Sequence, residues 1–356
     1  MNDKVLVLFL CAMFQWSAGG SVSRDIPISD HYDGKRFFNP TLEKQFHIGF
    51  GDMQKMVNQK RPKWPKDVKN VASPQLNEHL NEGDFSLTFV NHASFLIQTP
   101  TMNVLLDPVW SKRASPVGSI GPKRVREPGV HFDSLPKIDL ILISHNHYDH
   151  LDKYTIKKLN KRFAPQVIVP IGDKKLLHSF GVKDVQELDW WDSVSVSDDL
   201  KVVFTPQQHS SRRGLFDTDK SLWGSYFIKY RERSIYFGGD GGYSTHFRDI
   251  RARLGAPDVA MIGIGAYLPR VLMKPIHTSP ADAVKAHLDL NAKQSVAMHF
   301  GTFQLAADEF GEPQRELQKA IEKQKLGADD FIVMLEGETK FYRKSATKES
   351  QKEERL

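Results

Sequence analysis

Short apolar runs separated by turn-forming residues begin at about residue 85 of this chain and continue to about residue 335. Residues 85–90, 94–98 and 103–106 are rich in apolar side chains, and residues 138–143 form a nearly continuous apolar run. Runs of this length and composition are typical of strands buried in a core. The same pattern predicts further strands at residues 166–169, 194–205, 222–230, 234–237, 259–262, 295–298 and 331–335.

Helix signals separate several of these strands. Asp152 and Ser279 can each accept a hydrogen bond at a helix N-terminus, and Pro280 suits the first helical position after Ser279. Gly181 can end a helix that begins near residue 173. We therefore expect helices at residues 152–161, 173–180 and 314–325, and a further helix starting at residue 280.

Strands precede helices in two successive halves of the chain. This order predicts an α/β fold in which two sheets pack face to face with helices on the outside. With 356 residues the chain can bury a large core, and we assign residues 81–344 to this domain. Residues 21–80 show little periodicity and predict an irregular arm, with one helix near 42–58. The Lys- and Glu-rich residues 345–356 predict a disordered tail.

The first twenty residues have a different character. Residues 5–16 are apolar except for Gln15, and Lys4 precedes them. This run is short for a bilayer span, which needs about 20 residues, but it suits the core of a signal peptide. We predict that residues 1–20 are a signal peptide, with an N-terminal anchor as the alternative. The protein would then be exported, either periplasmic or membrane-associated. Cys11 is the only cysteine, so a processed chain would have no disulfide.

The formal net charge of +6 is modest for this length, but the basic residues are clustered. Basic stretches are often only a solvated surface; the alternative is contact with phosphate groups of an anionic membrane or of nucleic acid. Trp64 lies within one cluster, and an aromatic residue among lysines suits a membrane interface. One cluster contains Lys112, Arg113, Lys123, Arg124 and Arg126, and the other contains Lys55, Lys60, Arg61, Lys63, Lys66 and Lys69.

Three histidines and an aspartate follow the apolar run at residues 138–143. His145, His147, Asp149 and His150 lie within six residues. Side chains on a tight loop at a strand end can converge on one point, and imidazole and carboxylate groups are good zinc ligands. A loop of locally hydrogen-bonded histidines is the alternative, but this density of ligands favours a metal site.

The pattern His145-x-His147-x-Asp149-His150 resembles the signature of the metallo-β-lactamase superfamily of hydrolases. The resemblance implies an αββα sandwich of two mixed sheets, with two metal ions at one edge. It also implies three further ligands at later strand ends, for which His209, Asp240 and His299 are the candidates. By this resemblance His145, His147 and His209 hold one metal, Asp149, His150 and His299 hold the other, and Asp240 bridges them. Two zinc ions are expected, with other divalent transition metals as alternatives.

The resemblance also implies two supporting residues. Asp107 would support the metal-binding loop, and His92 would lie near the site. A carboxylate that accepts the free N–H of a ligand imidazole fixes the orientation of that ring. For Asp107 the alternative is a turn former before Pro108.

Four other segments carry a closer resemblance, to the branch that contains N-acylphosphatidylethanolamine-hydrolysing phospholipase D. They are residues 107–126, 222–225, 263–267 and 299–303, and the similarity extends from about residue 85 to residue 331. It implies hydrolysis of N-acylphosphatidylethanolamine to N-acylethanolamine and phosphatidate. Two close cations can lower the pKa of a water molecule and hold a phosphoryl oxygen.

Within this resemblance Asp149, Asp240 and His277 would be catalytic. His277 would lie beside the substrate and assist the leaving group; a loop histidine without a role is the alternative. Tyr148 would contact the substrate or only pack. Ile276 stands where mammalian members have glutamine, and it cannot hydrogen-bond an acyl amide.

Three other functions share parts of this pattern. A lactonase or a soluble phosphodiesterase of the same fold would use the same ligands. A nuclease would too, but no segment of this sequence predicts the added domain of such enzymes, and an exported enzyme rarely meets processed RNA, so nucleic acid is not an expected partner. A non-catalytic lipid-binding protein would be expected to have lost ligands, whereas every expected position is filled. The expected partners are therefore a phospholipid substrate and a membrane surface contacted peripherally, and a homodimer is compatible with the sequence.

Overall fold

The computed structural model describes residues 26–45, 61–76 and 78–344. The predicted signal peptide (1–20), the predicted tail (345–356) and Cys11 lie outside these residues. The same holds for most of the helix predicted at 42–58, and its described part, residues 42–45, is not helical. Among the residues that the structure describes, no helix is long and apolar enough to cross a bilayer.

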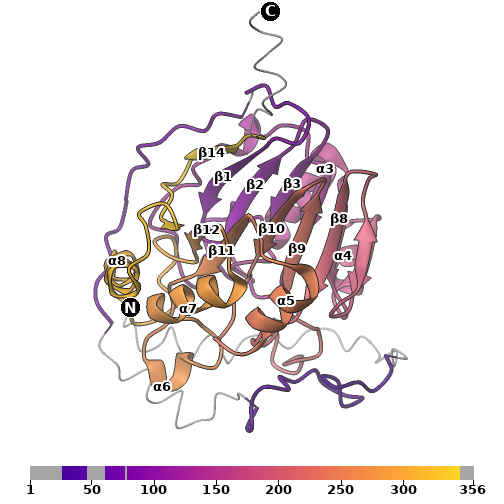
Figure 1. The fold of residues 1–356 in the computed structure, drawn as a ribbon. Helices are drawn as coiled ribbons and strands as arrows, with labels where there is room; N and C mark the ends of the chain where they lie inside the picture. The colour runs from indigo at the N-terminus through magenta and orange to yellow at the C-terminus, as the bar shows by residue number, and fades with distance from the viewer. Residues whose placement is uncertain (1–25, 46–60, 77, 345–356) are drawn as a thin grey trace, which may run out of the picture.

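Two seven-stranded sheets form the centre of the protein, and both mix antiparallel and parallel neighbours (Figure 1). In the first sheet the order is β14-β1-β2-β3-β4-β5-β6, antiparallel as far as β3 and parallel from β3 to β6. Its strands are β1 (Phe85–Asn91), β2 (Ser94–Gln98), β3 (Asn103–Leu106), β4 (Leu140–Leu142), β5 (Gln166–Pro170), β6 (Val185–Leu188) and β14 (Thr339–Tyr342).

The second sheet repeats this plan in the order β13-β12-β11-β10-β9-β8-β7. It is antiparallel from β7 to β10 and parallel from β10 to β13. Its strands are β7 (Ser193–Ser195), β8 (Leu200–Thr205), β9 (Ser225–Tyr230), β10 (Arg233–Phe237), β11 (Val259–Gly263), β12 (Gln294–Met298) and β13 (Phe331–Ile332).

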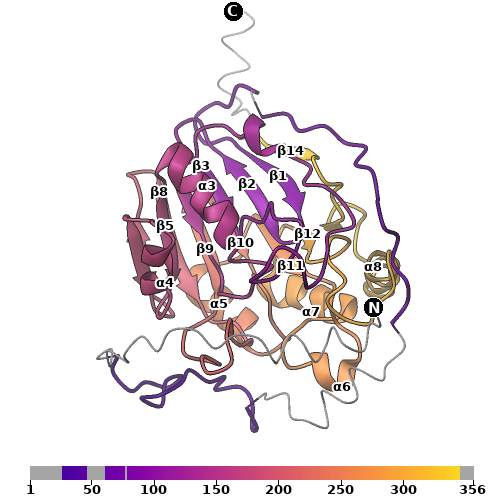
Figure 2. The same cartoon turned by 180° about the vertical axis from the view of Figure 1, so that it is seen from behind.

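Helices cover the outer faces of both sheets. Figures 1 and 2 show α3 on one side of the sandwich and α5 and α7 on the opposite side. The α-helices described are α3 (Lys153–Phe163), α4 (Lys174–Ser179), α5 (His246–Leu254), α6 (Arg270–Met273), α7 (Pro280–Leu290) and α8 (Glu312–Gln324), with a 3-10 turn η1 (Phe132–Ser134). The predicted αββα sandwich is therefore confirmed, as are the caps of two helices: the Asp152 side chain accepts from the amide of Tyr154, and Ser279 and Asp282 form a capping box.

The central strands are apolar throughout because both of their faces are buried. In β3, Val104 and Leu106 face the core between the two sheets, whereas Leu105 faces the core under α3. In β4, Ile141 likewise packs under α3, against residues such as Ile156. A strand buried on both faces does not alternate between apolar and polar residues, which explains the nearly continuous apolar run at residues 138–143.

Some element boundaries differ from the sequence prediction. The strand predicted at 138–143 pairs only as β4, three residues long, and the strand predicted at 331–335 pairs only at Phe331–Ile332. Strands β6 and β14 and helix α5 were not predicted. In β14 all four residues are only half-buried, so the strand lacks the apolar signal and is defined by pairing with β1.

Candidate metal centre

The loop between β4 and α3 carries four of the predicted ligands. At its start the amide of Ser144 donates to Asp107 Oδ1 at 2.8 Å. Further on, the amides of His150 and Leu151 both donate to the carbonyl oxygen of His147, at 3.1 and 2.8 Å. This tight turn allows side chains that are close in sequence to face one point at the end of the first sheet.

His145, His147 and His209 form the first ligand group. The Nδ1 atom of His147 lies 2.9 Å from His145 Nε2 and 3.2 Å from His209 Nε2. Burial lowers the pKa of each imidazole, that of His147 to about 4, and the neighbouring imidazoles lower those of His145 and His209 further. All three rings are therefore neutral at pH 7, which is the form that binds a metal.

Hydrogen bonds on the far side of two of these rings determine which nitrogen is free. His209 Nδ1 lies 2.9 Å from the carbonyl oxygen of Ile276, which can only accept, so this nitrogen carries the proton. His145 Nδ1 lies 2.9 Å from Ser144 Oγ, whose own hydrogen is donated to Asp107. Both Nε2 atoms thus keep their lone pairs and point them at the centre of the group, as ligands of a cation do.

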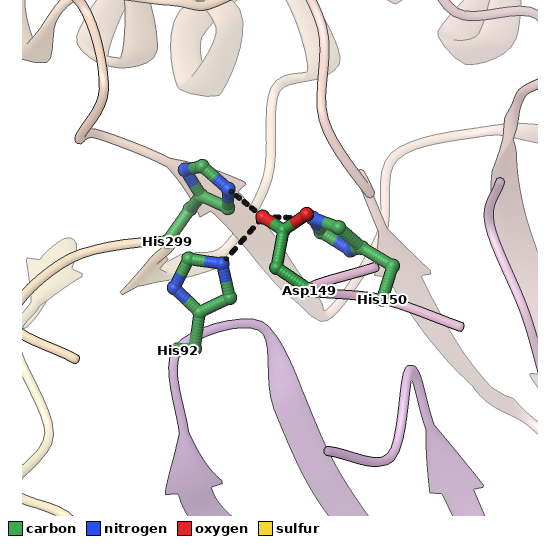
Figure 3. Close-up of side chains that lie close together, drawn as sticks. All are labelled: His92, Asp149, His150 and His299. Atoms are coloured by element: carbon green, nitrogen blue, oxygen red, sulfur yellow. Dashed lines mark hydrogen bonds and ion pairs between the residues drawn. The ribbon is translucent and has the colours of Figure 1, made fainter. Parts of the chain in front are cut away.

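The second ligand group combines Asp149, His150 and His299 with His92 (Figure 3). The Oδ2 atom of Asp149 lies 2.9 Å from His92 Nε2, 3.3 Å from His299 Nε2 and 3.4 Å from His150 Nε2. All four residues are buried. His92 lies at the turn between β1 and β2, so the group joins the two sheets.

Asp240 completes the second group and lies beside the first. Its Oδ2 atom is 3.0 Å from His299 Nε2 and 3.1 Å from His150 Nε2. Its other oxygen, Oδ1, is buried and has no hydrogen-bond partner among the described residues. The two groups adjoin, since the ring centroids of His145 and His150 are 4.2 Å apart. A buried carboxylate oxygen without a partner, next to converging imidazole lone pairs, fits a ligand shared by two cations.

Electrostatics in the second group differ from those in the first. Burial alone would lower the pKa of His299, but the charge of Asp240 and hydrogen bonds to Asp149 and Asp240 raise it to about 9. His150 is buried too, yet Asp240 and Asp149 raise its pKa well above the usual value. Burial would raise the pKa of the Asp149 and Asp240 carboxyls, but His150 and His299 hold both pKa values well below the usual value. Two carboxylates therefore require compensating positive charge, which a divalent cation can supply in place of the imidazole protons.

Asp107 supports the loop from behind, at the end of β3. Its Oδ2 atom accepts from His150 Nδ1 at 2.6 Å and from Ser144 Oγ at 2.5 Å. The bond to Nδ1 leaves Nε2 of His150 free to face the ligand group. Asp107, His92 and His299 all have positive φ angles, of 38°, 50° and 61°. Left-handed backbone in non-glycine residues is strained, and its concentration at these three strand ends indicates a functional site.

Glycine is required where the chain approaches Asp240 from β10. Gly239 has a φ of +56°, and a Cβ atom there would lie 2.7 Å from the Cβ of Ser144. The close approach of these two loops brings Asp240 against the loop that carries His145 and His150.

The N-terminal arm holds His209, a contact that the sequence did not indicate. Asn39 Oδ1 accepts from the amide of His209 at 3.0 Å and from Trp223 Nε1 at 3.2 Å, and Asn39 Nδ2 donates to the carbonyl of His209 at 2.8 Å. Asn39 thus pairs with the His209 backbone as a neighbouring strand would. Phe37, only 2% exposed, anchors this part of the arm in the main core.

The remaining predicted site residues lie around these groups. His277 Nδ1 is 3.9 Å from Asp240 Oδ2, and burial lowers the pKa of His277 to about 3. Its ring lies 5.4 Å from that of His209 and 5.2 Å from that of His299, so it borders both groups. Tyr148 donates its hydroxyl hydrogen to the carbonyl of Arg213 at 2.7 Å, and the Arg213 guanidinium lies over the Tyr148 ring.

Several residues of the predicted basic clusters are used inside the protein. The Arg124 side chain is buried and donates to the carbonyls of Val109 and Ser111, and Arg126 pairs with Glu336. Trp64 donates to the carbonyl of Asp308 at 2.9 Å and contacts Phe310 edge-on. Lys55 and Lys60 lie outside the described residues.

Fold and site together define a class of protein, and comparison with known proteins agrees. Residues 102–300, more than half of the chain, match the β-lactamase superfamily domain. The chain therefore belongs to the metallo-β-lactamase superfamily, and it is a metal-dependent hydrolase of that fold.

Individual proteins that are similar to the chain narrow the comparison further. The chain is 32% identical, over 314 residues, to an N-acyl-phosphatidylethanolamine-hydrolyzing phospholipase D 1 of Caenorhabditis elegans, covering 85% of this chain and 86% of that one. It is 38% identical to an uncharacterized protein of Mycobacterium tuberculosis, over 83% of this chain and 80% of that one. Among solved structures, a metallo hydrolase of Ignicoccus hospitalis matches with a TM-score of 0.57 and 21% identity, over 74% of this chain and all of that one, which shows the shared fold.

Proposed function

We propose that this protein is a phosphodiesterase with two metal ions that hydrolyses N-acylphosphatidylethanolamine in the manner of a phospholipase D. The products would be N-acylethanolamine and phosphatidate. The observation that carries the proposal is similarity to the Caenorhabditis elegans enzyme over most of both chains. The seven predicted ligands support it. His145, His147 and His209 form one group, and Asp149, His150 and His299 belong to another group beside it. Asp240 contacts His150 and His299.

In this proposal the chain's own residues have distinct tasks. His145, His147 and His209 would hold one cation, Asp149, His150 and His299 the other, and Asp240 both. Such a pair would lower the pKa of a water molecule and neutralise charge on the phosphodiester. His277, neutral and adjacent to both groups, would donate a hydrogen bond to the oxygen of the departing alcohol.

Vesicles containing N-acylphosphatidylethanolamine provide the test. Purified protein with its metal content measured should release N-acylethanolamine, and a chelator should stop the release until metal is restored. If the protein holds two equivalents of metal but releases no N-acylethanolamine, N-acylphosphatidylethanolamine is not its substrate.

A second candidate is a phosphodiesterase with another head group as its substrate. Ile276, whose side chain is buried and apolar, favours it, because this side chain offers no hydrogen bond to an acyl amide. Comparison of N-acylphosphatidylethanolamine with phosphatidylethanolamine, phosphatidylcholine, a water-soluble phosphodiester and a lactone separates the candidates. Equal turnover of N-acylated and unacylated phosphatidylethanolamine would favour the second candidate function.

A further inference from the structure

A surface loop at residues 211–221, which follows the predicted ligand His209, carries two exposed apolar side chains. Phe216 is 81% exposed and Leu215 is 36% exposed. A single exposed apolar residue needs no explanation, but here two adjacent ones are held out from the surface by a loop with many internal bonds.

The base of this loop is closed by hydrogen bonds. The amide of Asp219 donates to the carbonyl of Ser211 at 2.8 Å, and Ser211 Oγ donates to the carbonyl of Ser221 at 2.5 Å. Nearer the tip, Asp217 accepts from the amides of Arg213 and Gly214 at 3.2 and 2.8 Å. These bonds fix the backbone on either side of Leu215 and Phe216.

The same loop is bound to the metal-binding loop through Arg213. Its guanidinium donates to the carbonyls of Asn146 and Leu151, at 2.6 and 2.8 Å, and lies 4.0 Å from the ring centroid of Tyr148. Asn146 and Leu151 flank the ligands His147, Asp149 and His150. Arg213 thus ties both ends of that segment to the base of the exposed tip.

A cleft of about 670 Å³ lies beside the tip. Gly214 and Asp217, which flank Leu215 and Phe216, line it, and so does Tyr148. Three exposed lysines, Lys153, Lys175 and Lys220, complete its lining on the outside. No salt bridge joins these lysines to an acid within the described part of the chain.

Three acidic residues, Asp152, Asp173 and Asp217, also line the cleft. Asp152 accepts from Ser111 and Thr155, and Asp173 accepts from Asn146 and Ser221. Both of these carboxyl groups are buried. Asp217 is turned to the backbone of its own loop. The exposed charged side chains named in this lining are therefore lysines, next to an apolar tip.

We propose that this surface docks the protein on an anionic phospholipid bilayer, with Leu215 and Phe216 inserted among the acyl chains and the three lysines on lipid phosphates. This rests on the proposed phospholipid hydrolysis, and adds which face of the protein meets the membrane. Apolar insertion next to lysines is the combination that binds anionic interfaces, at about one kilocalorie, or fivefold, for each lysine. Through Arg213, docking would also hold the metal-binding loop in place while lipid enters.

Vesicle flotation tests the surface without any need for hydrolysis. The probe is phosphatidylcholine mixed with phosphatidylglycerol, compared with phosphatidylcholine alone. The double variant Leu215→Ser, Phe216→Ser should bind the mixed vesicles at least about tenfold more weakly than the unchanged protein. The double variant Lys175→Glu, Lys220→Glu should lose the preference for phosphatidylglycerol. Val71→Ser, at a residue that is 80% exposed on the arm, is the matched control and should bind normally.

The outcomes separate this inference from the proposed function. Melting temperature and metal content show that each variant is folded and loaded. If flotation depends on the tip and the lysines but no lipid is hydrolysed, the docking surface stands and the substrate proposal fails. If the tip variant floats as well as the unchanged protein, the inference is overturned. It is also overturned if the tip substitutions instead separate a dimer in light scattering while flotation is unchanged.

Discussion

The two candidate ligand groups differ in how they would accommodate a cation. The first group has three imidazoles and no carboxylate of its own, and burial keeps those rings neutral. The second has Asp149 and Asp240 within hydrogen-bonding distance of His150 and His299, whose pKa values are raised. The first is thus preformed for a cation, whereas the second must exchange protons for one. The difference teaches that metal binding at two adjacent positions can depend on pH at one position and be independent of pH at the other.

The largest effect is expected from Asp240→Asn, since this residue is the proposed shared ligand of both groups. An amide cannot supply the negative charge, and we expect activity to fall by more than about 100-fold, beyond the range for residues that only support a ligand. Elemental analysis should show metal lost from both groups. The control is Asp133→Asn, at an exposed aspartate of η1, which should leave metal and activity unchanged. Full metal content in Asp240→Asn would contradict the bridging position.

Substitution of one ligand in each group should separate them. His147→Gln and Asp149→Asn should each leave about one of two metal equivalents, because the other group keeps its own ligands. We expect losses of activity of at least about tenfold in both. Elemental analysis after dialysis is the measurement. If either variant loses all its metal, the two groups do not bind independently.

The third expected effect concerns pH. In the metal-free protein His299 and His150 keep their protons at pH 7, so metal binding at the second group must release them. Its affinity should fall by up to about tenfold for each proton and each pH unit as pH falls from 8 to 6. Affinity at the first group should stay flat, because the pKa of His147 is about 4. Titration calorimetry in buffers of different ionisation enthalpy counts the protons, and Asp149→Asn isolates the first group. If metal affinity had the same pH dependence at both groups, the proposed difference between them would be wrong.

The smallest effect on activity is expected from Asn39→Ala, which touches the first group alone. The backbone of His209 loses two hydrogen bonds and Trp223 loses one, so the free energy of unfolding should fall by roughly 1–3 kcal/mol. Metal affinity should weaken only at the first group. Denaturant unfolding and metal titration measure the two quantities. Asn70→Ala, at another arm asparagine whose amide bonds Glu127, is the matched control. Weakening of the second group instead would show that the arm acts on the whole centre.

The loop ligands were predictable because they are contiguous in sequence. His145, His147, Asp149 and His150 occupy one turn after a buried strand, so their density is a signal in itself. His209, Asp240 and His299 carry no such signal. Each was found through the family resemblance, and each lies at a different strand end of the second sheet.

The sequence by itself determined the α/β class, most of the central strands, the helix caps and the metal-binding loop, because each depends on residues that are near one another in the chain. Tertiary structure alone decided that Asn39 holds His209, that Arg124 is buried, and that β14 closes the first sheet. It also decided that the pKa values are lowered for the histidines of the first group and raised for His150 and His299 of the second. These features depend on burial and on contacts between residues that are distant in the chain, such as Asn39 and His209, 170 positions apart, and local patterns of apolar and polar residues do not encode either.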